Sequence, residues 1–226
     1  MHAVTLVVLT AASAATIWLA FYVFGYLPRI SQTQYREAMQ AFATAAELRF
    51  PSHRGLSVRV SRLSIAVGIE MGLNRRRLLD LEMAATLRDI GLCSVPYALL
   101  NERDRDEWTL DEAFAYDRHG EVSGSMLELV PRLSHLAQIV RNHHTEFASG
   151  EPVNGAARSQ IPLEAFILGA VTAYLRSEDL QGSFLAREAL MSKAGTAYEP
   201  RVVDALLRVL PSVRVGVVEP ADLVRS

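Results

Sequence analysis

The sequence contains very little cysteine and almost no excess of charge of either sign. Its single cysteine, Cys93, excludes an internal disulfide and any metal site built from several thiolates. The formal net charge of −2 at pH 7 gives no general attraction to a nucleic acid polymer, so no such partner is expected. No internal repeat or low-complexity segment occurs. Of the 226 residues 50% are hydrophobic, which is enough for one domain with a substantial core.

Charged side chains are missing altogether from residues 3–27, AVTLVVLTAASAATIWLAFYVFGYL. At a rise of about 1.5 Å per residue, a helix of this length exceeds the roughly 30 Å needed to cross a bilayer. Trp18, Tyr22 and Tyr26 lie in its C-terminal half, where amphipathic rings favour a membrane interface. The segment predicts an uncleaved anchor. A cleaved signal peptide is the competing interpretation, but it would begin with basic residues and have a shorter apolar core.

The basic residues around this segment predict its orientation. Arg29 and Arg36 follow the span, and no Lys or Arg precedes it, so the positive-inside rule places the remainder in the cytoplasm. We expect a single-pass protein of the cell inner (cytoplasmic) membrane. Its predicted parts are a transmembrane anchor (1–28), a helical linker (29–51), a soluble domain (52–212) and a C-terminal tail (213–226).

The predicted linker carries an apolar stripe with helical spacing, and Pro51 marks its end. The stripe consists of Tyr35, Met39, Phe42, Ala46 and Phe50. Two interpretations stay open at this point. The stripe could pair two chains by self-association, or it could pack on its own domain.

The soluble domain is predicted to be all-α, because apolar residues recur at helical spacing and no run of β-branched residues alternates. Gly72 and Gly91 are the expected ends of its first two helices. The sequence TLDE, residues 109–112, is typical of a capping box that opens the next helix. Pro131 breaks a later pattern, and two further helices are expected over residues 163–175 and 199–211.

Four motifs follow one another along this domain: LRDIGLCSVPYALL, DRHGEVSGSML, RNHHTEFASGEPVNGAARSQIP and AGTAYEPRVVDALLRVL. In order and spacing they resemble the His-Asp stretch, the His-x-x-x-Gly element, the double histidine with its Gly-Tyr-Pro loop, and the terminal helix of the HD-GYP family. That family is a branch of the HD-domain metal-dependent phosphohydrolases. The resemblance covers residues 56–210. It implies an HD-domain-like helical bundle and, as the family's typical activity, hydrolysis of cyclic di-GMP.

The resemblance implies two metal ions, but the positions that hold one of them have changed. The first metal-binding histidine of the family is Leu56 here, the histidine of the His-Asp pair is Arg88, and the late aspartate is Thr172. A guanidinium is permanently charged and has no lone pair to offer a cation. We therefore predict that Arg88 supplies the positive charge of the lost metal and pairs with a nearby carboxylate such as Asp89.

Two further family positions differ. The lysine that usually follows the Ile-Gly pair is Leu92, and the tyrosine of Gly-Tyr-Pro is Glu151. The Arg/Tyr-rich stretch that helps to hold the dinucleotide in the family has no clear counterpart in RSEDLQGSF, residues 176–184.

The family pattern leaves the other metal with Asp89, His119 and His143. Three such ligands with water form an open site for one divalent transition metal, Fe, Mn or Zn, and Asp89 would be the catalytic residue of an active enzyme. Alternatively, these are inherited polar residues held by hydrogen bonds. His144 is a further candidate. Next to His143 on a helix, however, it would point to a different face, which argues against both binding one ion.

Three other side chains could belong to a site. His53 could replace the histidine missing at Leu56, although a solvated residue near a helix start is the simpler interpretation. His135 lies outside every matched motif and is interpreted as structural. Cys93 is interpreted as a small buried hydrophobe.

Three functions are compatible with these observations. We favour a membrane-anchored cytoplasmic signalling or interaction module with a degenerate, inactive metal site, acting through a protein partner or self-association. One alternative is a metal-dependent phosphohydrolase or cyclic di-GMP phosphodiesterase with a reduced, single-metal site. The other is a nucleotide sensor that binds cyclic di-GMP without hydrolysis, and the missing basic and tyrosine contacts count against it.

Overall fold

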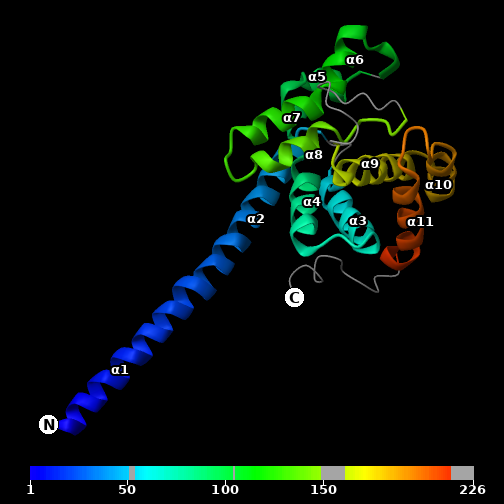
Figure 1. The fold of residues 1–226 in the computed structure, drawn as a ribbon. Coiled ribbons are helices and arrows are strands. Elements are labelled where there is room, and N and C mark those ends of the chain that lie inside the picture. The colour runs from blue at the N-terminus through cyan, green and yellow to red at the C-terminus, as the bar shows by residue number, and fades with distance from the viewer. Residues whose placement is uncertain (51–53, 104, 149–160, 215–226) are drawn as a thin grey trace. The chain divides into compact units, whose positions relative to one another are not determined.

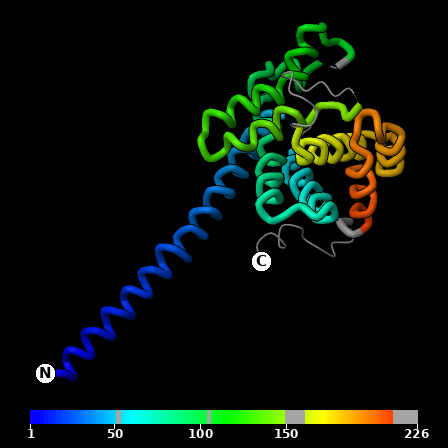
Figure 2. Tube along the Cα trace, viewed as in Figure 1, coloured from blue at the N-terminus to red at the C-terminus, as the bar shows by residue number. Residues whose placement is uncertain are grey.

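The computed structural model describes residues 1–50, 54–103, 105–148 and 161–214, and the chain divides into two compact units, Met1–Ala41 and Phe42–Ser226. Helices dominate both units (Figures 1 and 2). No strand occurs among the described residues, where an isolated bridge joins Ala194 and Tyr198. The predicted all-α fold class is confirmed.

The first unit belongs to one long helix. It begins as α1 (His2–Ala20), passes through a π-helical segment η1 (Phe21–Tyr26) and continues as α2 (Leu27–Glu47). The rings of Trp18, Tyr22 and Tyr26 stack in succession, with centroids 5.4 and 5.5 Å apart. Its apolar stretch is not buried, and by length and composition this helix could cross a membrane.

The second unit is a bundle built around α3 (Leu56–Glu70) and α9 (Leu163–Gln181), which contribute many of its fully buried side chains. The helix α3 packs against α4, α9 and α11, while α9 also packs against α10 and α7 packs against α8 and η3 (Figure 2). The helices after α2 are α3 (Leu56–Glu70), α4 (Arg75–Leu87), η3 (Ile90–Ser94), α5 (Tyr97–Asn101), η4 (Arg105–Glu107), α6 (Leu110–Asp117), α7 (His119–Glu128), η5 (Ser134–Leu136), α8 (Ala137–Arg141), α9 (Leu163–Gln181), α10 (Ser183–Ser192) and α11 (Pro200–Arg214).

Several predicted helix boundaries are confirmed. Gly72 follows α3 with a φ of 75°, a left-handed conformation that glycine adopts without a steric penalty. Thr109 and Glu112 form the expected capping box: Thr109 Oγ1 accepts from the Glu112 N–H at 3.3 Å, and Glu112 Oε2 accepts from the Thr109 N–H at 2.8 Å. Pro131 lies between α7 and η5, in the break that its ring predicts.

One boundary was predicted incorrectly. Gly91 does not end α4, which stops at Leu87; it lies inside η3. Its lack of a side chain serves another purpose. A Cβ atom at Gly91 would collide with the His119 carbonyl oxygen, so only glycine lets η3 approach the start of α7 this closely.

Part of the predicted linker is buried in the second unit. Phe50 is 2% exposed and packs with Leu92, Val95, Leu99 and Tyr116. Glu47 is also buried there. The predicted boundaries between anchor, linker, domain and tail stay predictions. Pro51, His53, Glu151 and most of the predicted tail lie outside the described residues.

Candidate metal centre

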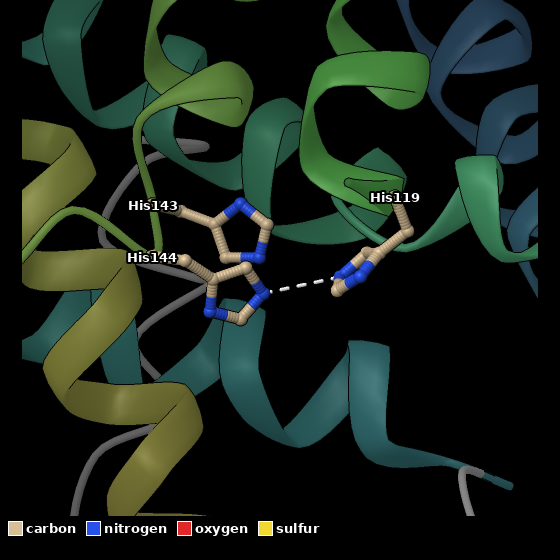
Figure 3. A group of neighbouring side chains, drawn as sticks. All are labelled: His119, His143 and His144. Atoms are coloured by element: carbon tan, nitrogen blue, oxygen red, sulfur yellow. Dashed lines mark hydrogen bonds between the residues drawn. The ribbon is translucent and has the colours of Figure 1, made fainter. Parts of the chain in front are cut away.

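Three histidine side chains meet in the second unit (Figure 3). His119 is the first residue of α7, and His143 and His144 lie in the turn that follows α8. Their ligand atoms all lie within 4.8 Å of one another, a grouping that could hold a metal ion. The Nε2 atoms of His119 and His144 are 3.1 Å apart, and the ring centroids of His143 and His144 are 3.8 Å apart.

The expectation that His144 points away from His143 is wrong. It assumed that both residues lie on a helix, where adjacent side chains diverge by about 100°. Because α8 ends at Arg141, the two histidines occupy a turn instead, and their rings face the same space.

Backbone carbonyl groups hold two of these rings in one orientation. Nδ1 of His119 donates to the Tyr116 carbonyl at 2.6 Å, and Nδ1 of His143 donates to the Val140 carbonyl at 2.6 Å. A proton on Nδ1 leaves the lone pair on Nε2, which is how metal-binding histidines are usually prepared. Nε2 of His143 is buried and has no hydrogen-bond partner among the described residues.

Two rings of the cluster, those of His143 and His144, favour the neutral form. Burial, assisted by the neighbouring His119, lowers the pKa of His143 to about 3. Desolvation inside the cluster also lowers the pKa of His144 well below its ordinary value, with His143 and His119 adding to the effect, although part of this side chain is exposed. Neutral rings near pH 7 are the form that binds a cation.

Asp89 lies beside the histidines and forms the predicted pair with Arg88. Nη2 of Arg88 is 2.8 Å from Oδ2 of Asp89, and the Arg88 side chain is 0% exposed. Burial by itself would raise the pKa of the Asp89 carboxyl. The guanidinium of Arg88, with help from Arg176, instead holds that pKa well below its usual range.

The second oxygen of Asp89 faces the histidine cluster. Oδ1 lies 3.4 Å from Nε2 of His119 and has no hydrogen-bond partner in the described part of the chain. Two buried atoms with lone pairs, Asp89 Oδ1 and His143 Nε2, are thus left unsatisfied, and both residues lie beside His119. Buried polar groups are normally satisfied, so this donor set fits one cation.

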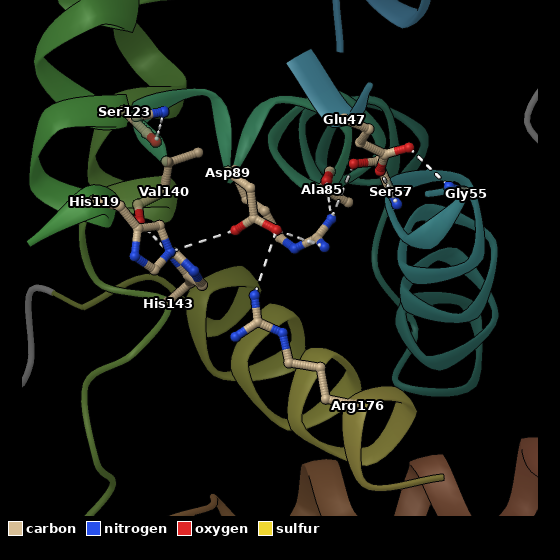
Figure 4. A network of polar contacts seen from close by, with 12 residues as sticks. Glu47, Gly55, Ser57, Ala85, Asp89, His119, Ser123, Val140, His143 and Arg176 are labelled. Carbon is tan, nitrogen blue, oxygen red and sulfur yellow. Dashed lines mark hydrogen bonds and ion pairs between the residues drawn. The ribbon is translucent and has the colours of Figure 1, made fainter. Parts of the chain in front are cut away.

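Arg176 is a site residue that sequence reasoning missed. It lies on α9, where Nη2 is 3.7 Å from Asp89 Oδ2 (Figure 4). Its Nη1 donates to the Tyr116 hydroxyl at 3.1 Å. Arg176 opens the stretch in which no family counterpart was recognised. The available signal was its position one helical turn after Thr172, which puts both residues on the same face of α9.

Apart from Arg88, the substituted family positions that the structure describes are apolar or neutral. Leu56 begins α3 and is 3% exposed; Thr172 lies on α9 and is 2% exposed. Leu92 packs in the apolar cluster around Phe50. Leu56 and Leu92 carry no group that binds a cation, and the Thr172 hydroxyl is a far weaker ligand than a carboxylate.

His135 and Cys93 lie outside this cluster. His135 pairs with Asp80 Oδ1 at 3.0 Å on the surface, and Cys93 is partly buried with a free thiol. Neither belongs to the histidine group.

A cavity of about 160 Å³ opens beside His143 and His144. It is bounded by residues of the loop after α8, of α9, and of the segment between α10 and α11, among them Lys193 and Tyr198. A second cavity of about 210 Å³ shares Ala173, Lys193 and Tyr198 with the first. Lys193 is exposed and is the only lysine in the sequence.

A curated relative is the cyclic di-GMP phosphodiesterase response regulator RpfG of Xanthomonas campestris pv. campestris (strain 8004). It is 29% identical over 184 residues, and the alignment covers 76% of this chain and 47% of RpfG. The chain therefore spans about half the length of this relative.

Two solved structures have the same fold. One is the cyclic GMP-AMP specific phosphodiesterase V-cGAP3 of V. cholerae, with a TM-score of 0.61, 16% identity, and coverage of 79% of this chain and 49% of that one. The other is Bd1817, an HDG"Y"P protein from Bdellovibrio bacteriovorus, with a TM-score of 0.60, 18% identity, and coverage of 85% and 68%. The HD domain family itself matches residues 40–194, well over half of the sequence. The chain is a member of the HD domain family.

Proposed function

We propose that this protein is a membrane-anchored cytoplasmic signalling or interaction module whose metal centre is reduced to one divalent transition metal ion and does not hydrolyse cyclic dinucleotides. The observation that carries the proposal is the fully buried Arg88 guanidinium, 2.8 Å from Asp89 Oδ2. It occupies the position of a histidine in the family pattern and satisfies the oxygen that a second cation would need.

Hydrolysis by two metals requires a water activated between two cations, and both cations must be held. By the family pattern the changed positions Leu56, Arg88 and Thr172 belong to one of them. A fixed guanidinium repels a second cation, and Leu56 provides no ligand to offset that repulsion. The residues therefore fit one ion and not two.

The residues that would hold the remaining ion are His119, His143 and His144, with Asp89 beside them. Such nitrogen and oxygen ligands suit Fe, Mn or Zn. When bound, the ion would act as a Lewis acid. The chain's own contribution is orientation: carbonyl groups of Tyr116 and Val140 fix two rings, and Arg88 and Arg176 keep Asp89 ionised.

The membrane location is part of the proposal. The N-terminal helix could span a bilayer, and Arg29 and Arg36 follow the apolar segment. We place the helix in the inner membrane and the second unit in the cytoplasm. A reporter fused to the C-terminus that is active only in the cytoplasm tests this orientation. Activity of a reporter that requires export would contradict it.

A single-metal phosphohydrolase is the second candidate function. It is favoured by the unsatisfied His143 Nε2 and by the cavity of about 160 Å³ beside it, which could admit part of a nucleotide. RpfG is named for activity on cyclic di-GMP and V-cGAP3 for activity on cyclic GMP-AMP, so these are the nucleotides to test. Binding of cyclic di-GMP without cleavage would instead support a sensor.

The deciding experiment combines metal content and turnover. The full chain is purified in detergent without chelator, its metals are counted by mass spectrometry, and it is incubated with cyclic di-GMP or cyclic GMP-AMP in the presence of Mn²⁺ or Fe²⁺. We expect no more than one ion per chain, loss of that ion in His119→Ala but not in the surface control His135→Ala, and no product. Product formation that disappears in His119→Ala would overturn the proposal in favour of the hydrolase. Calorimetry with cyclic di-GMP tests the sensor.

A further inference from the structure

The last residue of α2 is a buried carboxylate that contacts a different helix. Glu47 is 8% exposed. Its Oε2 accepts a hydrogen bond from the Gly55 N–H at 2.9 Å, and its Oε1 accepts one from the Ser57 N–H at 2.7 Å (Figure 4). A buried carboxylate is costly unless hydrogen bonds and opposite charge compensate it, so these contacts define where the end of α2 lies within the second unit.

Glu47 supplies what α3 itself lacks. The first N–H groups of a helix have no partner within the helix, and the helix dipole places partial positive charge there. Gly55, at the N-cap of α3, has no capping side chain, and no acidic residue lies in the first turn. The carboxylate of α2 therefore caps α3 at the turn that contains Leu56 and Ser57.

Arg88 extends these contacts to Asp89. Its Nη1 donates to the Ala85 carbonyl at 2.8 Å and lies 3.4 Å from Ser57 Oγ, while its Nη2 pairs with Asp89. Glu47 acts on Arg88 electrostatically and favours its charged form. A continuous path thus runs from the end of α2 through Ser57 and Arg88 to the carboxylate beside the histidines.

The charges along this path balance. Glu47 and Asp89 carry negative charge, and Arg88 and Arg176 carry positive charge. Removing the Glu47 charge would leave an excess of positive charge beside Asp89. That excess would strengthen the hold of Arg88 on Asp89 and oppose any cation at the histidine cluster.

We propose that Glu47 is a positioning residue of the metal centre, through which the placement of the last turn of α2 controls cation binding at Asp89 and the histidines. The metal-affinity part of this inference rests on the proposed one-metal centre. The helix α2 continues from the apolar segment. A displacement of that segment in the membrane that moves Glu47 away from α3 would therefore lower metal affinity. By linkage, metal binding would in turn favour the seated position of Glu47.

The first test uses hydrogen exchange on the full chain in detergent with chelator, so that it does not depend on metal. Glu47→Gln is compared with the wild type and with Glu37→Gln, a matched change at an exposed position of the same helix. We expect faster exchange in Glu47→Gln both at the start of α3, residues 55–57, and around Asp89, residues 88–92. Faster exchange at residues 55–57 alone would mean that Glu47 is only a cap, and would overturn the inference.

The second test measures Mn²⁺ affinity by titration. We expect binding weakened roughly tenfold in Glu47→Gln, a size typical of changes behind the ligands themselves. Glu47→Asp, which keeps the charge, should recover most of the affinity, and Glu37→Gln should leave it unchanged. Unchanged affinity in Glu47→Gln would overturn the inference. If the wild type binds no metal, the proposed metal centre fails, and hydrogen exchange alone decides the role of Glu47.

A milder variant covers the case in which Glu47→Gln does not fold. Ser57→Ala keeps the backbone N–H that donates a hydrogen bond to Glu47, but it removes the hydroxyl beside Arg88. It should accelerate exchange at residues 88–92 while residues 55–57 keep their protection. No change at residues 88–92 would contradict the path.

Discussion

Nη2 of Arg88 and Oδ2 of Asp89 lie 2.8 Å apart, in a pair of sequence neighbours whose arginine has no exposed surface. Removing one partner of such a pair leaves a buried charge uncompensated, which typically costs about 3–5 kcal/mol. We expect Arg88→Met to lower the free energy of unfolding by about 3 kcal/mol, because Arg176 at 3.7 Å offsets part of the loss. Urea denaturation measures the change.

An exposed pair provides the control for that variant. Arg208 pairs with Glu70 at 2.6 Å on the surface, and such pairs contribute about 0–1 kcal/mol. Arg208→Met should therefore change the free energy of unfolding far less than Arg88→Met. Equal effects would show that the buried pair has no special role.

Restoring the family residues should restore the second metal. We expect the combined variant Leu56→His, Arg88→His, Thr172→Asp to bind one more ion per chain than the wild type, since it removes the guanidinium and supplies the missing ligands together. Arg88→His alone should not bind an additional ion, because the other two positions still provide neither an imidazole nor a carboxylate. Mass spectrometry of the purified proteins counts the ions. An extra ion in the single variant would show that Arg88 alone blocks the second site.

The metal-free protein should lose stability as the pH falls below about 6.5, the ordinary pKa of histidine. Burial keeps the pKa of His143 at about 3 in the folded state. Between this pKa and the ordinary one, the unfolded chain therefore binds a proton that the folded chain does not bind. Each such group contributes a slope of at most about 1.4 kcal/mol per pH unit, and His144 acts in the same direction.

Unfolding with chelator at several pH values measures this slope. His143→Gln should flatten it, whereas His135→Gln, at an exposed pair with Asp80, should leave it unchanged. A wild-type slope that survives in His143→Gln would assign the effect to other groups.

Gly91→Ala should disturb the metal centre through the backbone. A Cβ atom there would collide with the carbonyl oxygen of His119, so η3 or α7 must shift, at a cost of about 1–3 kcal/mol. Gly25→Ala, whose Cβ would meet Phe21 at an ordinary 3.6 Å, is the matched control. Urea denaturation reports the cost, and the NMR signals of the His119 ring report the shift. Unchanged signals would mean that the added methyl group is accommodated without a shift of His119, and would contradict this prediction.

The fold was predictable where single residues carry strong local signals. Gly72 and the Thr109–Glu112 box mark helix ends by their own backbone chemistry, and the structure has both. The helix α10 was not singled out from the sequence; it packs against α9 and buries Ala186 and Leu190. The buried face of α10 is defined by tertiary packing, which the local pattern of apolar residues does not reveal.

The site was only partly predictable for a similar reason. Asp89, His119 and His143 were found by motif, and their role as metal ligands stays a prediction. The shared space of His143 and His144 depends on α8 ending at Arg141, a detail of turn geometry. Arg176 reaches Asp89 only because α9 crosses beside the cluster, so no linear motif predicted this contact.

Lys193 offers a practical handle on this centre. As the only lysine of the chain, exposed and at the rim of the cavity beside His143 and His144, it gives amine-selective reagents a single side-chain target. A dye or isotope label attached there would sit next to the centre without mutagenesis. Its emission or resonance would then follow the arrival of an ion, a nucleotide or a protein partner in real time.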